Sequence, residues 1–187
     1  MAMQKLGWVR RAAQVSMNDR INTTLLYREV QQFRQPWIWV VLLFSSLAAL
    51  TAAATPFFVG SSWAQNWILN LILILFGIIF GILFPILFYI AALIAEVRTD
   101  GLYISFYPLL FAPILIPFNN IVRCQVRQYH PLREYGGWGI RYGSQGKAYN
   151  VSGDRGVQLE LANGEKILIG SGNPEALVRA INVFTNL

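Results

Sequence analysis

The chain has 187 residues, a net charge of +6 and 55% hydrophobic residues, but only 13% of its residues are charged. Because a soluble domain usually contains about 25% charged residues, this composition excludes an ordinary soluble protein. The deficit is local, since residues 36–95 contain no Asp, Glu, Lys, Arg or His. The flanking segments, 1–35 and 96–187, leave room for one small domain and exclude two.

The positive charge is concentrated before this apolar segment. Residues 1–35 contain six basic and two acidic residues, whereas residues 96–187 contain nine basic and seven acidic residues. Basic residues next to a membrane span contact anionic lipid headgroups. We therefore expect the tail to lie against a membrane surface, and we predict no binding of nucleic acid.

The tail ends in a short amphipathic segment. Leu26, Val30 and Phe33 recur at helical spacing with polar residues between them. This pattern predicts a short amphipathic helix in the membrane interface, and Asn22 or Thr23 would cap it. The alternative is a cytoplasmic extension of the first membrane span.

Two apolar runs follow, at 37–59 and 67–95. A transmembrane helix needs about 20 residues to cross a hydrocarbon core of about 30 Å, so both runs are long enough, and the second should tilt or bend. We expect the bend at Pro85, whose ring would meet the carbonyl of Gly81 in a regular helix. The uncharged connection at 60–66 makes the pair an antiparallel hairpin.

Basic residues determine the expected orientation of this hairpin. The tail has six of them, the connection between the spans has none, and Arg98 follows the second span. Under the positive-inside rule, both termini are cytoplasmic. Tryptophans near the span ends are typical interfacial anchors, and here they are Trp37, Trp39, Trp63 and Trp67.

Within the second run, Gly77 and Gly81 form a small-xxx-small pattern. Small residues at this spacing allow the close approach of another helix. We favour packing against the first span of the same chain, which offers a surface of small residues: Ala48, Ala49, Ala52 and Ala53. The alternative is packing against a helix of another protein.

Residues 97–187 are expected to form a cytoplasmic β-rich domain. Strand formers and turn residues predict about seven short strands, including segments at 102–107, 122–129, 138–142, 147–151, 157–161 and 166–170. Asn173, Pro174 and Glu175 are typical of a helix start, which predicts a helix from 174 to about 185. The predicted class is α+β, with this helix covering the open face of a curved antiparallel sheet.

Several motifs resemble known families. Thr-Asp-Gly-Leu-Tyr-Ile at 99–104, the segment 114–121 and the helix start at 173–175 resemble bacterial pleckstrin-homology-like (PH-like) domains on membrane anchors. The segments 27–30, 131–139 and 148–153 resemble a prokaryotic family of small two-span membrane proteins of unknown function, and this likeness covers most of the chain from residue 27 onward. The resemblance implies the fold and the topology, and it implies no enzymatic activity. A looser similarity, in topology alone, is to the two-span photosystem I assembly factors of cyanobacteria and plastids. The expected location is therefore a plasma membrane or a thylakoid membrane.

No catalytic, metal or cofactor site is predicted. Cys124 and His130 are the only cysteine and histidine. Along an extended strand they would be about 20 Å apart, which excludes a nucleophilic pair, and together they fall short of a zinc site. We expect Cys124 to be a small apolar residue of the domain core, and we predict that the protein is not an enzyme.

The candidate binding surface is the glycine-rich stretch 129–156. Its basic residues alternate with aromatic residues, a pattern that favours stacking and bidentate contacts with anions, and its glycines would let a ligand approach the backbone. The candidate residues are Arg133, Tyr135, Trp138, Arg141, Tyr142, Lys147, Tyr149 and Arg155. The alternative is a glycine-bent rim of the sheet, in which the arginines pair with Glu134 and Asp154.

Two functions follow from these features. In the first, the protein is a non-enzymatic module in the lipid bilayer whose cytoplasmic domain binds a membrane-protein partner, in the assembly or stabilisation of a membrane complex. In the second, the 129–156 surface binds or senses anionic lipid headgroups. The looser similarity adds a photosystem assembly-type factor as a third possibility. Two spans without a charged residue provide no ion path, so a transporter is the least expected function.

Overall fold

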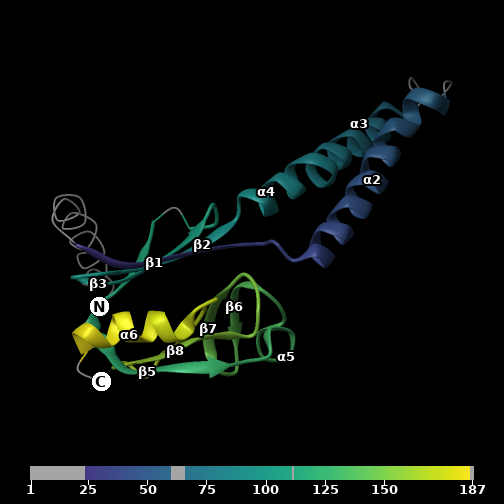
Figure 1. The fold of residues 1–187 in the computed structure, drawn as a ribbon. Helices are drawn as coiled ribbons and strands as arrows, with labels where there is room; N and C mark the ends of the chain where they lie inside the picture. Colours follow the sequence, from purple (N-terminus) through teal and green to yellow (C-terminus); the bar gives the residue numbers. More distant parts are fainter. Residues whose placement is uncertain (1–23, 60–65, 111, 186–187) are drawn as a thin grey trace, which may run out of the picture.

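The computed structural model describes residues 24–59, 66–110 and 112–185. A long helical hairpin projects from a β-rich domain, in which two sheets and a C-terminal helix pack together (Figure 1). The hairpin consists of α2 (Pro36–Val59), α3 (Trp67–Phe76), the π-helical segment η2 (Gly77–Leu83) and α4 (Phe84–Ile90). The expected caps at Asn22 and Thr23, and Trp63 in the expected connection, lie outside the described residues.

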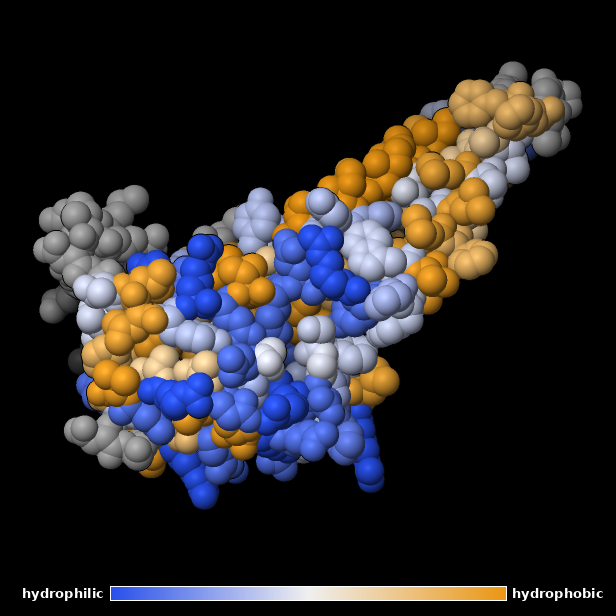
Figure 2. All heavy atoms as spheres, viewed as in Figure 1, coloured by the Kyte–Doolittle hydropathy of each residue, from blue (hydrophilic) through white to orange (hydrophobic). Residues whose placement is uncertain are grey.

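Both arms of the hairpin, Pro36–Phe58 and Trp67–Ile90, are long and apolar enough to cross a membrane. Large apolar side chains face outward along them; Phe44 on α2, for example, is 71% exposed. Hydrophobic residues cover the hairpin, whereas hydrophilic residues cover much of the domain (Figure 2). An apolar surface of this extent requires a lipid or protein environment. The second arm ends at Ile90 rather than at residue 95, because residues 92–95 belong to a strand.

Gly77 and Gly81 lie against α2 of the same chain. A Cβ on Gly77 would come within 2.4 Å of the Ala53 Cβ and 3.2 Å of the Ala49 carbonyl oxygen. A Cβ on Gly81 would come within 2.7 Å of the Leu50 Cγ. The close approach of the two arms therefore depends on the missing side chains.

The helix adapts to Pro85 through a widened turn. In a regular α-helix the proline ring would meet the Gly81 carbonyl. Here the preceding seven residues, Gly77–Leu83, are π-helical, and the Phe84 N–H bonds to the Ile79 carbonyl, five residues earlier. A π-helical segment is one of the known ways in which a helix bends around an obstruction.

The segment before the hairpin is a strand, β1 (Leu25–Gln32), so the predicted amphipathic helix and the alternative helical extension are both wrong. Arg28 and Val30 are exposed, whereas Glu29 between them is partly buried and bonds to the rest of the domain. The segment thus alternates with a period of two. β1 pairs with β2 (Ala92–Arg98), which follows the hairpin, and this pairing satisfies backbone groups along an edge of β2 that would otherwise be open.

The remaining strands form two sheets. The first has the order β1-β2-β3-β4 and is antiparallel, and the second has the order β5-β8-β9-β7-β6 with a parallel β7–β9 pair. The bounds are β3 Gly101–Tyr107, β4 Ile114–Ile116, β5 Ile121–Gln128, β6 Gly139–Gly143, β7 Gly146–Asn150, β8 Arg155–Leu161 and β9 Lys166–Gly170. The described residues thus contain nine strands in two sheets, not about seven in one curved sheet.

The hairpin is inserted into the domain between β1 and β2. The sequence predicted that the domain begins at residue 97. The domain instead includes residues on both sides of the hairpin. Since β1 and β2 are neighbours in one sheet, both ends of the hairpin are held at the same edge of the domain. The orientation of the hairpin is therefore coupled to the orientation of the sheet.

The C-terminal helix α6 (Pro174–Thr185) forms where it was predicted, but it packs against strands of both sheets rather than on the open face of one curved sheet. The Asn173 side-chain oxygen accepts a hydrogen bond from the Ala176 N–H at 3.2 Å and caps the helix. Leu177 and Ile181 are fully buried in the same cluster as Leu93, Ile104 and other residues of both sheets. The helix is thus held by its apolar face, which supplies most of the stability of a short helix.

Glu29 attaches β1 to the segment between β9 and α6. Its carboxylate accepts hydrogen bonds from the Ser171 hydroxyl and the Gly172 N–H, both at 2.6 Å. It also accepts bonds from the Tyr27 hydroxyl at 2.9 Å and the Gln31 amide at 3.1 Å. Burial, together with the neighbouring Glu29 carboxylate, raises the pKa of Tyr27 to about 12. This arrangement places the end of β1, and Phe33 after it, against the second half of the domain.

Cys124 on β5 is partly buried against the core, and burial raises the pKa of its thiol to about 12. The thiolate is the reactive form, so at pH 8 we expect the folded protein to react about a thousandfold more slowly with a disulfide reagent than the unfolded chain does. Stopped-flow measurement of thiol release checks this. A Ser144→Cys variant in a Cys124→Ala background is the control, because position 144 is exposed and should react at the unfolded rate. Equal rates for the native and unfolded chains would contradict the assignment.

Candidate functional site

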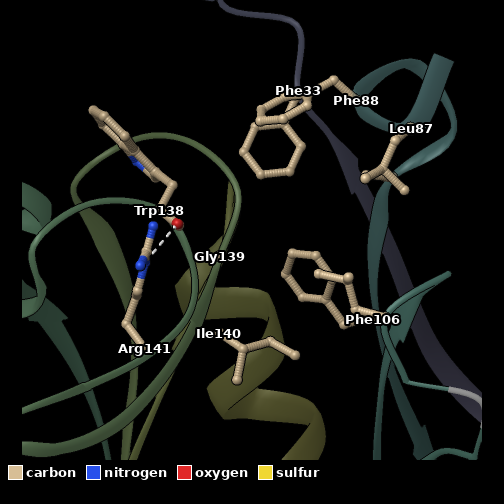
Figure 3. A pocket seen from close by; sticks show the side chains of 10 residues that line it. Phe33, Leu87, Phe88, Phe106, Trp138, Gly139, Ile140 and Arg141 are labelled. Carbon is tan, nitrogen blue, oxygen red and sulfur yellow. Dashed lines mark hydrogen bonds between the residues drawn. The ribbon is translucent and has the colours of Figure 1, made fainter. Parts of the chain in front are cut away.

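A cavity of about 300 Å³ lies where the helical hairpin meets the domain (Figure 3). Four separate segments line it: the residue after β1, the end of α4, the end of β3 with its following turn, and the start of β6. The lining residues are Phe33, Leu87, Phe88, Ala91, Phe106, Leu109, Trp138, Gly139, Ile140 and Arg141. The site therefore exists only when the hairpin and both sheets are assembled.

Aromatic rings form much of the cavity wall. The Phe33 ring lies 5.1 Å from the Phe88 ring and 6.5 Å from the Phe106 ring, measured between centroids. Trp138 lies on the opposite side of the cavity (Figure 3), and its ring is 5.7 Å from that of Trp37 on α2. The contacts of Phe33 with Phe88 and of Trp37 with Trp138 join the hairpin to the domain at two points.

Arg141 supplies the positive charge at the cavity. Its Nε donates a hydrogen bond to the Trp138 carbonyl at 3.0 Å, and its side chain is exposed. Within the described part of the chain, none of the ion pairs involves Arg141. The terminal nitrogens of this guanidinium are thus oriented by the backbone contact and remain able to bind an anion.

A second cation lies at the same junction. The Arg34 guanidinium carbon is 5.2 Å from the centre of the Tyr89 ring at the end of α4, and its Nη2 donates to the Gln32 side-chain oxygen at 2.7 Å. A guanidinium over an aromatic face gains about 0.5–1 kcal/mol at an exposed site. This contact keeps a positive charge beside the last turn of α4.

Of the eight predicted surface residues, two line the cavity and three form a separate group. Trp138 and Arg141 belong to the cavity. Lys147 lies over Tyr142 and Tyr149, with its Nζ 5.2 Å and 4.8 Å from the ring centres. Burial alone would lower the pKa of Lys147, but its interactions with the Tyr149 and Tyr142 hydroxyls outweigh burial and raise it.

The remaining predicted residues lie outside both groups, in the core, in an ion pair or on the surface. Tyr135 is buried and packs edge-on against Tyr129, and Tyr149 is itself only 1% exposed. Arg155 forms an ion pair with Glu175, and Arg133 is exposed on the short helix α5 (Pro131–Tyr135). The 129–156 stretch is thus partly core and partly surface.

Glu134 and Asp154, the expected ion-pair partners of the arginines in this stretch, have other partners in the structure. Glu134 pairs with Arg127, outside the stretch, and Asp154 accepts a hydrogen bond from Gln128 at 2.8 Å. Gly143 allows a close approach of α5 to β6, since a Cβ there would come within 2.2 Å of the Glu134 carbonyl oxygen. Part of the glycine content therefore has a packing role.

Most of the cavity residues were not predicted from the sequence. Phe33 was expected on the face of an amphipathic helix, and Leu87 and Phe88 belong to a uniformly apolar span in which no side chain is distinguished from its neighbours. The signal that could have identified the site is the presence of Arg34 just before the first apolar run and of Trp37 at its start, since Arg and Trp mark the level of the membrane interface.

No curated protein matches the chain. A family model described as a family of unknown function (DUF6141) matches residues 18–185. The match includes β1, the hairpin, both sheets and α6. It covers most of the chain, and the chain therefore belongs to the DUF6141 family, a family of unknown function.

Proposed function

We propose that the protein is a non-enzymatic membrane module that binds one anionic phospholipid in the cavity at the base of its hairpin. The observation that carries this proposal is an apolar, aromatic-lined cavity at the end of a helix long enough to span a membrane. Arg141 on β6 lines this cavity and forms no ion pair with any described residue. An acyl chain would lie against Phe33, Phe88 and Phe106, and the phosphate would contact Arg141. Anionic phosphate and guanidinium form charge-assisted, bidentate hydrogen bonds.

The orientation proposed for this function puts the tail and the domain in the cytoplasm. Support comes from the basic residues before the first span and their absence from the connection between the spans. The β1–β2 pairing adds that the start and the end of the hairpin lie on one side. Anionic lipids are concentrated in the cytoplasmic leaflet, where each nearby basic residue contributes about 1 kcal/mol.

We further propose that the domain is PH-like and of prokaryotic type. Four antiparallel strands, then the antiparallel set β5-β8-β9, then a closing helix follow the order of such domains. In this comparison α5, β6 and β7 form an insertion between β5 and β8. The insertion supplies Trp138 and Arg141, so the proposed lipid site would be a feature of this insertion.

The headgroup, not the acyl chain, should determine affinity. Moving an acyl chain from the bilayer into an apolar cavity exchanges one apolar environment for another, so it contributes little driving force. A charge-assisted hydrogen bond contributes about 1.5–3 kcal/mol. Phosphatidylcholine carries the same phosphate, but its choline cation would meet Arg141 with like charge. Binding should therefore favour phosphatidylglycerol over zwitterionic phosphatidylcholine.

Native mass spectrometry of the full chain in detergent, with added phosphatidylglycerol or phosphatidylcholine, tests this proposal. Arg141→Ala should weaken phosphatidylglycerol binding at least about tenfold, which corresponds to about 1.4 kcal/mol. Ala91→Leu should weaken it as well, because the added side chain occupies the cavity that Ala91 lines.

Arg133→Ala is the matched control, since Arg133 is exposed on α5 and does not line the cavity. Its binding should equal that of the unchanged protein. Equal affinity for the two lipids, or equal losses in Arg133→Ala and Arg141→Ala, would leave only non-specific charge attraction and would contradict the proposal.

A protein partner is the second candidate function. Leu132 on α5 and Tyr142 on β6 are 69% and 76% exposed, and α5 packs beside β6. Exposed large apolar and aromatic side chains are typical anchors of a protein interface. In cross-linking of native membranes, Leu132→Ala with Tyr142→Ala should remove a specific adduct and leave phosphatidylglycerol binding unchanged. Persistence of the same adduct would exclude this surface.

A further inference from the structure

The loop between β3 and β4 contains no charged residue. From Tyr107 to Ile114 the sequence is Tyr-Pro-Leu-Leu-Phe-Ala-Pro-Ile. A surface loop of a soluble domain is normally polar, because its backbone and side chains face water. An uncharged loop with large apolar side chains requires a different environment.

The strand order directs this loop toward the membrane helices. β2 begins two residues after the end of α4 and runs away from the hairpin, and β3 runs back antiparallel to it. Ala92 at the start of β2 pairs with Tyr107 at the end of β3. The chain after Tyr107 therefore returns to the level at which the second membrane arm ends (Figure 1).

The residues that line the cavity show independently that the loop lies at the level of the end of α4. Leu109 lines the same cavity as Leu87, Phe88 and Ala91. These residues occupy the last turn of α4 and the position that follows it. Leu109 thus lies beside the end of the membrane arm, not beneath the domain.

The loop also has exposed side chains. Tyr107 and Leu109 are 56% and 55% exposed, and Ala112 is exposed as well. At the end of α4, Tyr89 and Ile90 are 57% and 38% exposed. Tyr107 pairs with Ala92, two residues after Ile90, so the exposed side chains of the loop begin where those of the second arm end. A tyrosine at this border has the amphipathic character of a membrane-interface residue.

From this placement we infer that the described residues of the β3–β4 loop, 107–110 and 112–113, insert into the interface of the same leaflet and are a second membrane contact of the domain, beside the hairpin. The occupant is the lipid bilayer. Continuity with α4 puts the loop at the headgroup level, and a loop without charge meets no desolvation penalty of an ionised group there. The consequence is that the domain is held in one orientation against the leaflet, with the cavity opening toward lipid.

Spin-label accessibility in liposomes tests the inference. Single cysteines are placed at 112, 89 and 163 in a Cys124→Ala background and labelled with a nitroxide in the full chain, reconstituted in phosphatidylglycerol–phosphatidylcholine vesicles. Position 89 is the membrane reference. Position 163 is the aqueous reference, because it lies in the exposed β8–β9 turn. This turn is next to the backbone hydrogen bond from the Ala162 N–H to the Asn120 carbonyl, at the end of the β5–β8 pair that includes Ile121 and Leu161.

The measured quantity is the ratio of the collision frequency with oxygen to that with a water-soluble nickel complex. This ratio should be several-fold higher at position 112 than at position 163, and close to the ratio at position 89. A ratio at 112 equal to that at 163 would overturn the inference. Tyr107→Cys provides a second label position at the same loop, in case one variant fails to reconstitute. Position 112 does not line the cavity, so this result and the lipid-binding result can fail separately.

Discussion

Glu29→Ala is expected to lower the free energy of unfolding of the domain by about 3 kcal/mol. Glu29 accepts four hydrogen bonds, two of them from Ser171 and Gly172 on the far side of the domain. Removing the carboxylate takes this acceptor from the partly buried Tyr27 and Ser171 hydroxyls, and each such group costs about 1–3 kcal/mol. Chemical unfolding of the full chain in detergent, followed by tryptophan fluorescence, measures the change.

Glu29→Gln is the informative comparison. One amide oxygen can take the place of the Oε1 atom that accepts from Gly172 and Gln31. The amide nitrogen would then face the Tyr27 and Ser171 hydroxyls, which can rotate to accept a hydrogen bond. We therefore expect less than half the loss seen with Ala. A loss below about 1 kcal/mol in Glu29→Ala would show that β1 is held mainly by its backbone pairing with β2.

The second large effect is expected in the hairpin, where Gly77→Ala should destabilise the pairing of the two arms by about 1–3 kcal/mol. A Cβ at 77 would meet the Ala53 Cβ at 2.4 Å, and that atom is fixed to the backbone of α2. The arms must therefore move apart, and packing along the whole contact is lost. Titration of the full chain with a denaturing detergent in mixed micelles measures this loss.

Gly81→Ala is the matched control for this substitution. It makes the same chemical change one turn away, so any gain in intrinsic helix propensity is shared by the two variants. The atoms that it would meet belong to the Leu50 side chain, at 2.7 Å and 2.8 Å, and this side chain can change rotamer. Gly81→Ala should therefore cost clearly less. Equal costs would mean that the arms do not pack at Gly77 as described.

Features set by local chemistry were predictable from the sequence. The apolar helices follow from an uncharged run that is long enough to span a membrane. The helix α6 follows from the Asn173 cap and from the helical spacing of Leu177 and Ile181. The β8–β9 hairpin follows from Asn163-Gly164 in its turn. In each case residues close in sequence carry the whole signal.

Features that depend on distant partners were not predictable in this way. Leu26, Val30 and Phe33 fit a helical spacing as well as a strand, and pairing with β2 on the other side of the hairpin decided between them. The sequence around Tyr149 predicted an aromatic side chain on the surface, yet the parallel pairing of β7 with β9 buries it. Local propensity is a weak prior that tertiary pairing overrides.

The sequence alone determined that two apolar helices join a basic tail to a small α+β domain, because hydropathy, helix capping and turn chemistry act over a few neighbouring residues. Only the tertiary structure decided that the hairpin is inserted within the domain, and that Phe33, Phe88, Phe106 and Arg141 surround one cavity. The physical reason is that β1 and β2 lie on opposite sides of the hairpin in sequence but share a ladder of hydrogen bonds. That ladder draws the ends of both arms of the hairpin to the edge of the sheet where the cavity forms.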